Sequence, residues 1–130
     1  MTFQAAQRPD QPQAVTTLLS NLNVRIAWTA PTDNFKPITK YEVLIQDTDA
    51  SGNFVEDTVH CDGSNALILT QDYCDVPMTT ALRASPFNLV QGQVVIAKIK
   101  AYNERGWSDF SPANTAGAKI QTEPAYMAPP

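Results

Sequence analysis

Apolar and polar side chains alternate in several short runs of this sequence, and this alternation restricts the fold more than any other feature. Successive side chains of a β-strand point to opposite faces, so a strand with one buried face shows a period of two. The runs 23–28 and 41–46 follow this period, with apolar residues at Val24, Ile26, Trp28, Tyr41, Val43 and Ile45. Each run therefore predicts a β-strand with one buried face.

The longest alternating run covers residues 94–102 and predicts a central strand. One face carries Val95, Ala97, Ile99 and Ala101, and the other carries Val94, Ile96, Lys98, Lys100 and Tyr102. Turn residues separate the runs, no stretch shows a helical period, and the 10 prolines argue against long helices. Short strands without intervening helices predict an all-β, two-sheet sandwich, with the last strand over 118–122.

Length and charge exclude several classes of function. The 130 residues suit one domain that buries its own core. A net charge of −4 provides no positive electrostatic potential that would attract nucleic acid. No segment reaches the roughly 18 consecutive apolar residues needed for membrane insertion. With a single histidine and no motif of a nucleophile, phosphate loop or zinc helix, we expect no enzyme activity and no cofactor.

The only two cysteines, Cys61 and Cys74, end the polar segment CDGSNALILTQDYC. The segment lacks the further ligands of a zinc site, so the pair is interpreted as a disulfide formed in an oxidising compartment. We therefore expect an extracellular or cell-surface protein. The alternative is a pair of free thiols in a cytosolic domain.

Asp47 and Asp49 have the spacing with which a calcium-binding loop begins. The closing position of such a loop is occupied by Thr58, which supplies no carboxylate. A hairpin turn is favoured over a calcium site, and calcium binding stays open.

Several motifs together resemble fibronectin type III domains. Residues 37–43 read PITKYEV, similar to the start of the third strand (C) in that family. Further matches to the family pattern are Trp28, Pro31, Leu89, Gly92, Ile99, Ala101, Asn103, Gly106, Ser108 and Ser111. The resemblance implies a seven-stranded, immunoglobulin-like Greek-key sandwich over residues 9–124, preceded by an extension (1–8) and followed by a Pro-rich linker (125–130).

The sequence departs from the family pattern at two points. Val95 stands where the family has a corner tyrosine, so the hydroxyl that ties that corner is missing. Residues 56–87 exceed the usual connection between strands C' and E, and they contain the cysteine pair. We therefore expect an extended, disulfide-clamped insertion, as in modules of tandem-repeat surface proteins.

Residues 107–111 (WSDFS) resemble the tryptophan–serine box of cytokine-receptor domains, in which cations of strand F stack on aromatic rings. Lys98 and Lys100 share the outward face that such stacking needs, and a structural role is favoured over ligand contact.

An apolar strip is expected on the same outward face. There Leu44 should lie near Val94 and Ile96, and Glu42 near Lys100. This apolar strip needs a cover, for which the insertion is favoured over a partner protein.

The expected function is that of a non-catalytic structural or adhesion module, acting as a spacer and protein-contact surface within a larger surface or filament protein. Its partners would be neighbouring modules or other surface proteins. The alternatives are a peptide- or glycan-binding module, an accessory domain of a secreted enzyme, and self-association into filaments. Candidate partner-binding residues are Leu44, Val94, Ile96, Tyr102, Arg105 and Trp107.

Overall fold

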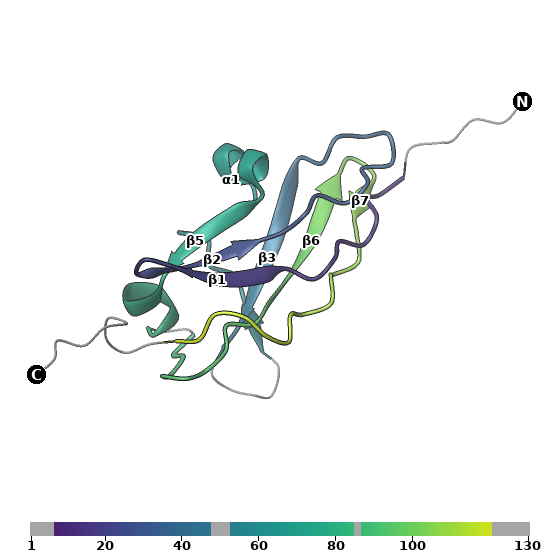
Figure 1. Ribbon diagram of the computed structural model, residues 1–130. Helices are drawn as coiled ribbons and strands as arrows, with labels where there is room; N and C mark the ends of the chain where they lie inside the picture. Colours follow the sequence, from purple (N-terminus) through teal and green to yellow (C-terminus); the bar gives the residue numbers. More distant parts are fainter. Residues whose placement is uncertain (1–6, 48–52, 85–86, 121–130) are drawn as a thin grey trace, which may run out of the picture.

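Two antiparallel sheets form the protein in a computed structural model, which describes residues 7–47, 53–84 and 87–120 (Figure 1). The strands are β1 (Thr16–Ser20), β2 (Asn23–Ala27), β3 (Lys40–Gln46), β4 (Phe54–Val55), β5 (Tyr73–Pro77), β6 (Ala97–Asn103) and β7 (Gly106–Trp107). One sheet has the order β1-β2-β5 and the other β4-β3-β6-β7, and the chain passes between them after β2, β4 and β5. The predicted all-β Greek-key sandwich with seven strands is confirmed.

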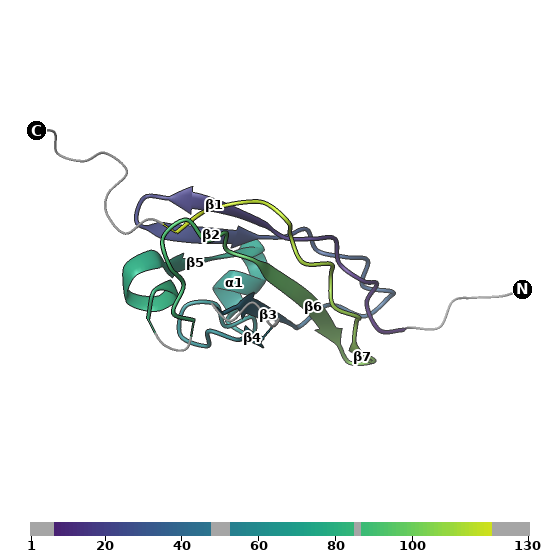
Figure 2. The same ribbon diagram turned by 90° about the horizontal axis from the view of Figure 1, so that it is seen from below.

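The core lies between the two layers, which Figure 2 shows from another side. The alternating residues predicted to be buried are so: Val24, Ile26, Trp28, Tyr41, Val43, Ile45, Val95, Ala97, Ile99 and Ala101. The indole of Trp28 lies against the ring of Tyr41, with 5.3 Å between ring centroids. Period-two alternation therefore identified the inward face of each long strand correctly.

The segment after β7 differs from the strand predicted over 118–122. Side-chain oxygens of Ser108, Ser111 and Asn114 accept the backbone N–H groups of alternate β6 residues, at 2.8–3.0 Å. These side chains replace a strand partner along β6, and Pro112 has no N–H to contribute. Residues 108–118 consequently follow β6 without forming a strand, and only Lys119 makes a β-bridge, to Val94, in the described part of this segment. Residues 121 and 122 lie outside the described residues.

The strand predicted over 94–102 is central, between β3 and β7, but begins at Ala97. Before it lies Val95, at the position where the sequence departs from the fibronectin type III pattern. Its carbonyl accepts hydrogen bonds from Thr17 Oγ1 (3.2 Å) and Asn114 Nδ2 (3.0 Å). Two polar side chains from other segments thus hold this corner without a tyrosine hydroxyl.

The absence of helices was predicted wrongly. A short helix, α1 (Ala66–Gln71), is capped by the side chain of Asn65, and a π-helix, η1 (Met78–Leu82), follows β5. Neither is long enough to show a helical period, and α1 has no fully buried residue. The strand β5 lies inside the stretch 56–87, so the extra length is divided between the β4–β5 and β5–β6 connections. The prediction of one long connection before strand E was too simple.

The β4–β5 connection is attached to both sheets. A disulfide joins Cys61 to Cys74 of β5, and both cysteines are buried in the core. The carbonyl of Gly63 accepts the N–H of Tyr41 on β3 at 3.0 Å. A Cβ atom at position 63 would collide with the backbone carbonyl of Tyr41, so glycine is needed for this close approach. The predicted disulfide clamp is confirmed.

His60, the single histidine of the sequence, lies half-buried in a turn. Its Nδ1 is 2.9 Å from the carboxylate of Asp57, which also accepts the N–H groups of Val59 and His60. Burial raises the pKa of Asp57, but these hydrogen bonds outweigh burial and the net pKa is lowered from 3.8. The carboxylate therefore organises the turn that leads into Cys61.

Stability should pass through a maximum in mild acid. Burial and neighbouring carboxylates raise the pKa of Glu56 above 4.5, and burial raises that of Asp72 above 3.8, so the folded state gains stability as these two groups take up protons. Asp57, Asp62 and Glu104 act in the opposite sense, because their lowered pKa values give stability that is lost as pH falls below the ordinary values of 3.8 for aspartate and 4.5 for glutamate. Denaturant unfolding from neutral pH down to about pH 3 tests this. Asp57→Asn should flatten the acid limb, and a steady decline from neutral pH would contradict the assignment.

Candidate functional site

Aromatic rings and lysines alternate across the outer face of the four-stranded sheet. Lys98 Nζ lies 4.4 Å from the Phe54 ring and 4.6 Å from the Phe110 ring. Lys100 Nζ lies 4.7 Å from both Phe110 and Trp107. We call Phe54, Lys98, Phe110, Lys100, Trp107, Lys40 and Tyr102 the cation–ring ladder.

The far end of the ladder is built by β3, β6 and β7. Lys40 Nζ is 4.7 Å from the ring of Tyr102 and 5.4 Å from that of Trp107. The two rings contact each other with centroids 5.0 Å apart, because Tyr102 and Trp107 are paired across β6 and β7. The expected stacking of Lys98 and Lys100 on this box is thus confirmed, and Lys40 extends it.

Strand register explains why these groups meet. Lys98 and Lys100 are two positions apart on β6, so both point outward. Glu42 of β3 pairs with Lys100, and their side chains form an ion pair at 3.5 Å, as predicted. The ladder is therefore a consequence of the same alternation that builds the core.

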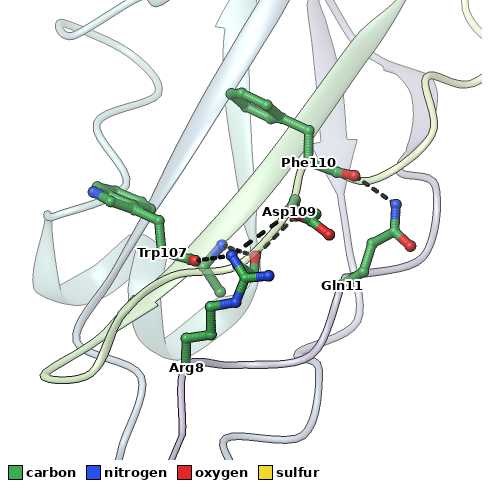
Figure 3. A network of polar contacts seen from close by, with 7 residues as sticks. Arg8, Gln11, Trp107, Asp109 and Phe110 are labelled. Atoms are coloured by element: carbon green, nitrogen blue, oxygen red, sulfur yellow. Dashed lines mark hydrogen bonds and ion pairs between the residues drawn. The ribbon is translucent and has the colours of Figure 1, made fainter.

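The segment before β1 fastens the backbone that carries two of the rings (Figure 3). Arg8 Nη1 donates to the Trp107 carbonyl at 3.3 Å and lies 3.7 Å from a carboxylate oxygen of Asp109. Gln11 Nε2 donates to the Phe110 carbonyl at 2.7 Å. Sequence reasoning missed these residues, because a side chain that binds a distant backbone carbonyl leaves no periodic signal.

The apolar strip predicted on this face is divided by a lysine. Leu44 pairs with Lys98, whereas the carbonyl of Ile96 accepts the N–H of Gln46. Leu44, Val94 and Ile96 are half-buried. Contact of this strip with a partner stays a prediction.

Arg105 lies exposed in the turn between β6 and β7, and its N–H donates to the side chain of Asn103. It stands apart from the ladder contacts of Tyr102 and Trp107. Beside Trp107, the β4–β5 connection contributes Glu56, Asp62 and Ser64 to a pocket of about 300 Å³. The connection thus reaches the β3 edge of this face.

Neither a metal-binding cluster nor a membrane-spanning helix occurs in the described ranges. There, no group of three or more His, Cys, Asp or Glu is placed to hold a metal ion. Asp49, half of the calcium hypothesis, lies outside the described residues, so that hypothesis stays open. In the same ranges no helix has the length and apolar character needed to cross a bilayer.

Removing one ladder cation should lower stability modestly. Lys98 contacts two rings, and each contact is worth about 0.5–1 kcal/mol, so Lys98→Met should lower the free energy of unfolding by about 1–2 kcal/mol. Methionine keeps the apolar stem that packs between the rings. A double-mutant cycle with Phe110→Leu isolates the charge-dependent part. Additive effects of the two substitutions would show that the contact contributes no coupling energy.

Comparison with known proteins gives structural matches only. No protein-family model matches the sequence, and no curated protein sequence matches it significantly. The sixth fibronectin type III domain of human fibronectin type III domain containing protein 3 matches with a TM-score of 0.60 and 14% identity, over 95% of this chain and 97% of that one.

Two larger structures match through one part of their length. The twitchin kinase region from C. elegans (Fn31-NL-kin-CRD-Ig26) has a TM-score of 0.59 and 17% identity, with 93% of this chain and 18% of that chain covered. The chicken CNTN1 FN1-FN3 domains have a TM-score of 0.54 and 18% identity, with 82% and 31% covered. The chain thus spans less than a third of either structure. Strand order and these likenesses show that the chain has the fibronectin type III fold.

Proposed function

We propose that the chain is a non-catalytic structural or adhesion module, which acts as a spacer and protein-contact surface within a larger extracellular protein. The observation that carries the proposal is the position of the two ends of the described chain. They lie at opposite ends of the sandwich (Figure 1). Modules of this kind can be joined in series without folding back on one another.

Hydrogen bonds define these two positions. Gln7 bonds to Asn34 and Asn103, at the end of β6. Ile120 donates to the carbonyl of Gln93, which precedes the start of β6. Because β6 runs the length of its sheet, a neighbouring module on either side would lie beyond opposite ends of the domain.

The ladder supports a structural role over ligand binding. Lys100 already lies between the rings of Trp107 and Phe110, and Lys40 occupies a position over Trp107 and Tyr102. Lysines and aromatic rings that already contact one another have less interaction surface left for a ligand. Extracellular placement is supported by the buried Cys61–Cys74 disulfide, since such bonds persist in oxidising compartments.

Small-angle scattering of two copies of residues 1–130 joined directly would test the spacer role. Pro-rich linkers act as semi-rigid spacers, so with the linker predicted over 125–130 we expect a maximum dimension about twice that of one copy. A matched tandem with a Gly/Ser segment in place of 121–130 should give a broader distribution of distances. A compact pair with the dimension of a globule, or catalytic turnover of a substrate by the single chain, would contradict the proposal.

A further inference from the structure

Phe35 is a large apolar side chain that the fold leaves in solvent at one end of the sandwich. It is 66% exposed. The β2–β3 loop that carries it lies at the end of the molecule where the described chain begins (Figure 1). There the N–H of Gln7 donates to the carbonyl of Asn34 at 3.2 Å. An exposed aromatic ring therefore lies beside the point at which the chain enters the domain.

The backbone at Phe35 has a conformation that a bulky side chain rarely adopts. Asn34 and Phe35 have φ angles of 55° and 76°. The N–H of Lys36 donates to the carbonyl of Asp33 at 3.4 Å, as in a type I′ turn. Asn-Gly is the preferred pair at the centre of such a turn, so phenylalanine in the place of glycine costs stability, and this ring gains little burial in return. A strained and exposed aromatic residue favours a role in contact with another molecule.

Hydrogen bonds hold this turn in place. The side-chain amide of Asn34 donates to the carbonyl of Arg8 at 2.8 Å and to the carboxylate of Asp10 at 3.0 Å. The carboxylate of Asp33 accepts the N–H of Phe35 at 3.0 Å. The ring is thus presented on a fixed backbone, and little conformational freedom is lost when such a group binds a surface.

The opposite end of the sandwich carries a second set of exposed apolar side chains. Leu22 of the β1–β2 turn is 71% exposed, and Val90, which follows η1, is 59% exposed. The carbonyl of Leu22 accepts the N–H of Met78 in η1 at 3.0 Å. The carbonyl of Val90 accepts the N–H of Gln93, whose own carbonyl accepts the N–H of Ile120. Both residues therefore lie at the end of the molecule where the described chain stops (Figure 1).

Cations accompany the apolar residues of this second end. Arg83 follows η1, and its N–H donates to the carbonyl of Met78 at 2.9 Å. Lys119 is exposed in the last described segment. Neither cation forms an ion pair with a described residue, and the sequence segments 19–23, 78–93 and 117–120 contain no acid. We give the name tail patch to Leu22, Val90, Arg83 and Lys119.

Negative charge predominates beside the exposed ring at the first end. Asp10 and Asp33 accept hydrogen bonds within the turn but form no ion pair with a described residue. Lys36 and Glu104 neutralise each other in a contact of 2.8 Å. Arg105 adds an exposed cation in the β6–β7 turn, so the balance of these unpaired charges is negative. We give the name head patch to Phe35, Asp10 and Asp33.

We propose that the tail patch of one copy of this chain binds the head patch of the next copy in a head-to-tail contact. This inference rests on the proposed role as a module joined in series. The ring of Phe35 would pack against Leu22 and Val90 of the preceding copy. The two acids of the head patch would face the two cations of the tail patch. Because the contact uses different surfaces on the two copies, it can repeat along a series of modules.

The size of the two patches decides how the copies must be connected. One ring and a few aliphatic side chains bury far less than the roughly 1,000 Å² that a stable interface between free proteins needs. A covalent linker raises the effective concentration of the two ends to about the millimolar range. We therefore expect the contact in a tandem, and association of separate copies only at about millimolar concentration.

NMR spectra of two directly joined copies of residues 1–130 test the contact. The copies are ligated so that only the first carries the isotopic label. The amide signals of its Leu22 and Val90 should shift relative to the single chain, whereas that of Leu18, an exposed residue on the outer face of β1, should stay. Single-chain positions for the signals of Leu22 and Val90 would overturn the proposal.

Phe35→Asn in the second copy removes the ring and keeps the turn. Asparagine is a common residue at the centre of type I′ turns, so the variant copy should be at least as stable as the original. The ratio of docked to free tandem should fall at least about tenfold, and the signals of Leu22 and Val90 should return to their single-chain positions. Leu18→Asn in the second copy is the matched control and should leave the shifts in place. Shifts that persist with Phe35→Asn would overturn the proposal.

Two charge reversals should act in opposite directions. Lys119→Glu in the first copy should reduce the shifts of Leu22 and Val90, because it places an acid opposite the head patch. Arg105→Glu in the second copy should increase them, because it adds negative charge facing the tail patch. Effects of the same sign, or none, would overturn the pairing of the two patches. A tandem that is extended in scattering but has single-chain spectra would leave the spacer role intact, whereas a compact pair would contradict that role.

Discussion

Asn103→Asp is expected to lower the free energy of unfolding by about 3–5 kcal/mol, since it places an uncompensated charge in the interior. Asn103 is fully buried at the end of β6. Its Nδ2 donates to the carbonyls of Gln7 (2.7 Å), Asp33 (2.9 Å) and Lys36 (3.4 Å). An aspartate would direct a carboxylate oxygen at these three acceptors, and repulsion would replace three attractive contacts.

The destabilisation caused by Asn103→Asp should become smaller as pH is lowered. Burial and the surrounding carbonyls would raise the pKa of the introduced aspartate in the folded state. Stability should therefore recover as pH falls through that raised pKa, because the protonated acid can donate a hydrogen bond. Denaturant unfolding at several pH values measures this.

Asn21→Asp provides a matched control, because Asn21 is exposed in the β1–β2 turn and its left-handed backbone suits aspartate as well. This substitution should change stability by less than about 0.5 kcal/mol. If Asn103→Asp were as mild as the control, the three-way contact would not be holding the N-terminal segment and the β2–β3 loop to β6.

The layers and core of this fold could be predicted because long strands repeat their environment every two residues. Ile99 and Lys100 belong to opposite faces of β6, and this single fact places one in the core and the other in the ladder. The ladder was predictable for the same reason. Its rings and cations lie at positions set by strand register, and register follows from the buried face.

Features held by single side chains could not be predicted. Helix α1 depends on the Asn65 cap and is too short for a periodic face. The irregular course of 108–118 depends on three side-chain acceptors that take the place of a strand. Arg8 and Gln11 bind backbone carbonyls 99 positions away. Each of these results from a tertiary contact that leaves no repeating pattern in the sequence.

Removal of the disulfide should be the other large effect, because the bond acts on the unfolded chain as well as on the core. In the loop-entropy model, joining residues 13 positions apart stabilises the folded state by about 3 kcal/mol. Cys61 and Cys74 are also both buried, so a Cys61→Ala/Cys74→Ala double variant loses core contacts in addition. We expect a loss of at least about 3 kcal/mol in denaturant unfolding.

The reducing agent itself supplies the control for that experiment. Reductant should shift the unfolding midpoint of the wild-type chain and leave that of the double alanine variant unchanged. Hydrogen exchange should speed up most in α1, because the disulfide and the Gly63–Tyr41 hydrogen bond attach this connection to the sheets. An unchanged midpoint under reduction would mean that the sandwich holds the β4–β5 connection by packing alone, and the disulfide would then no longer support placement of the protein in an oxidising compartment.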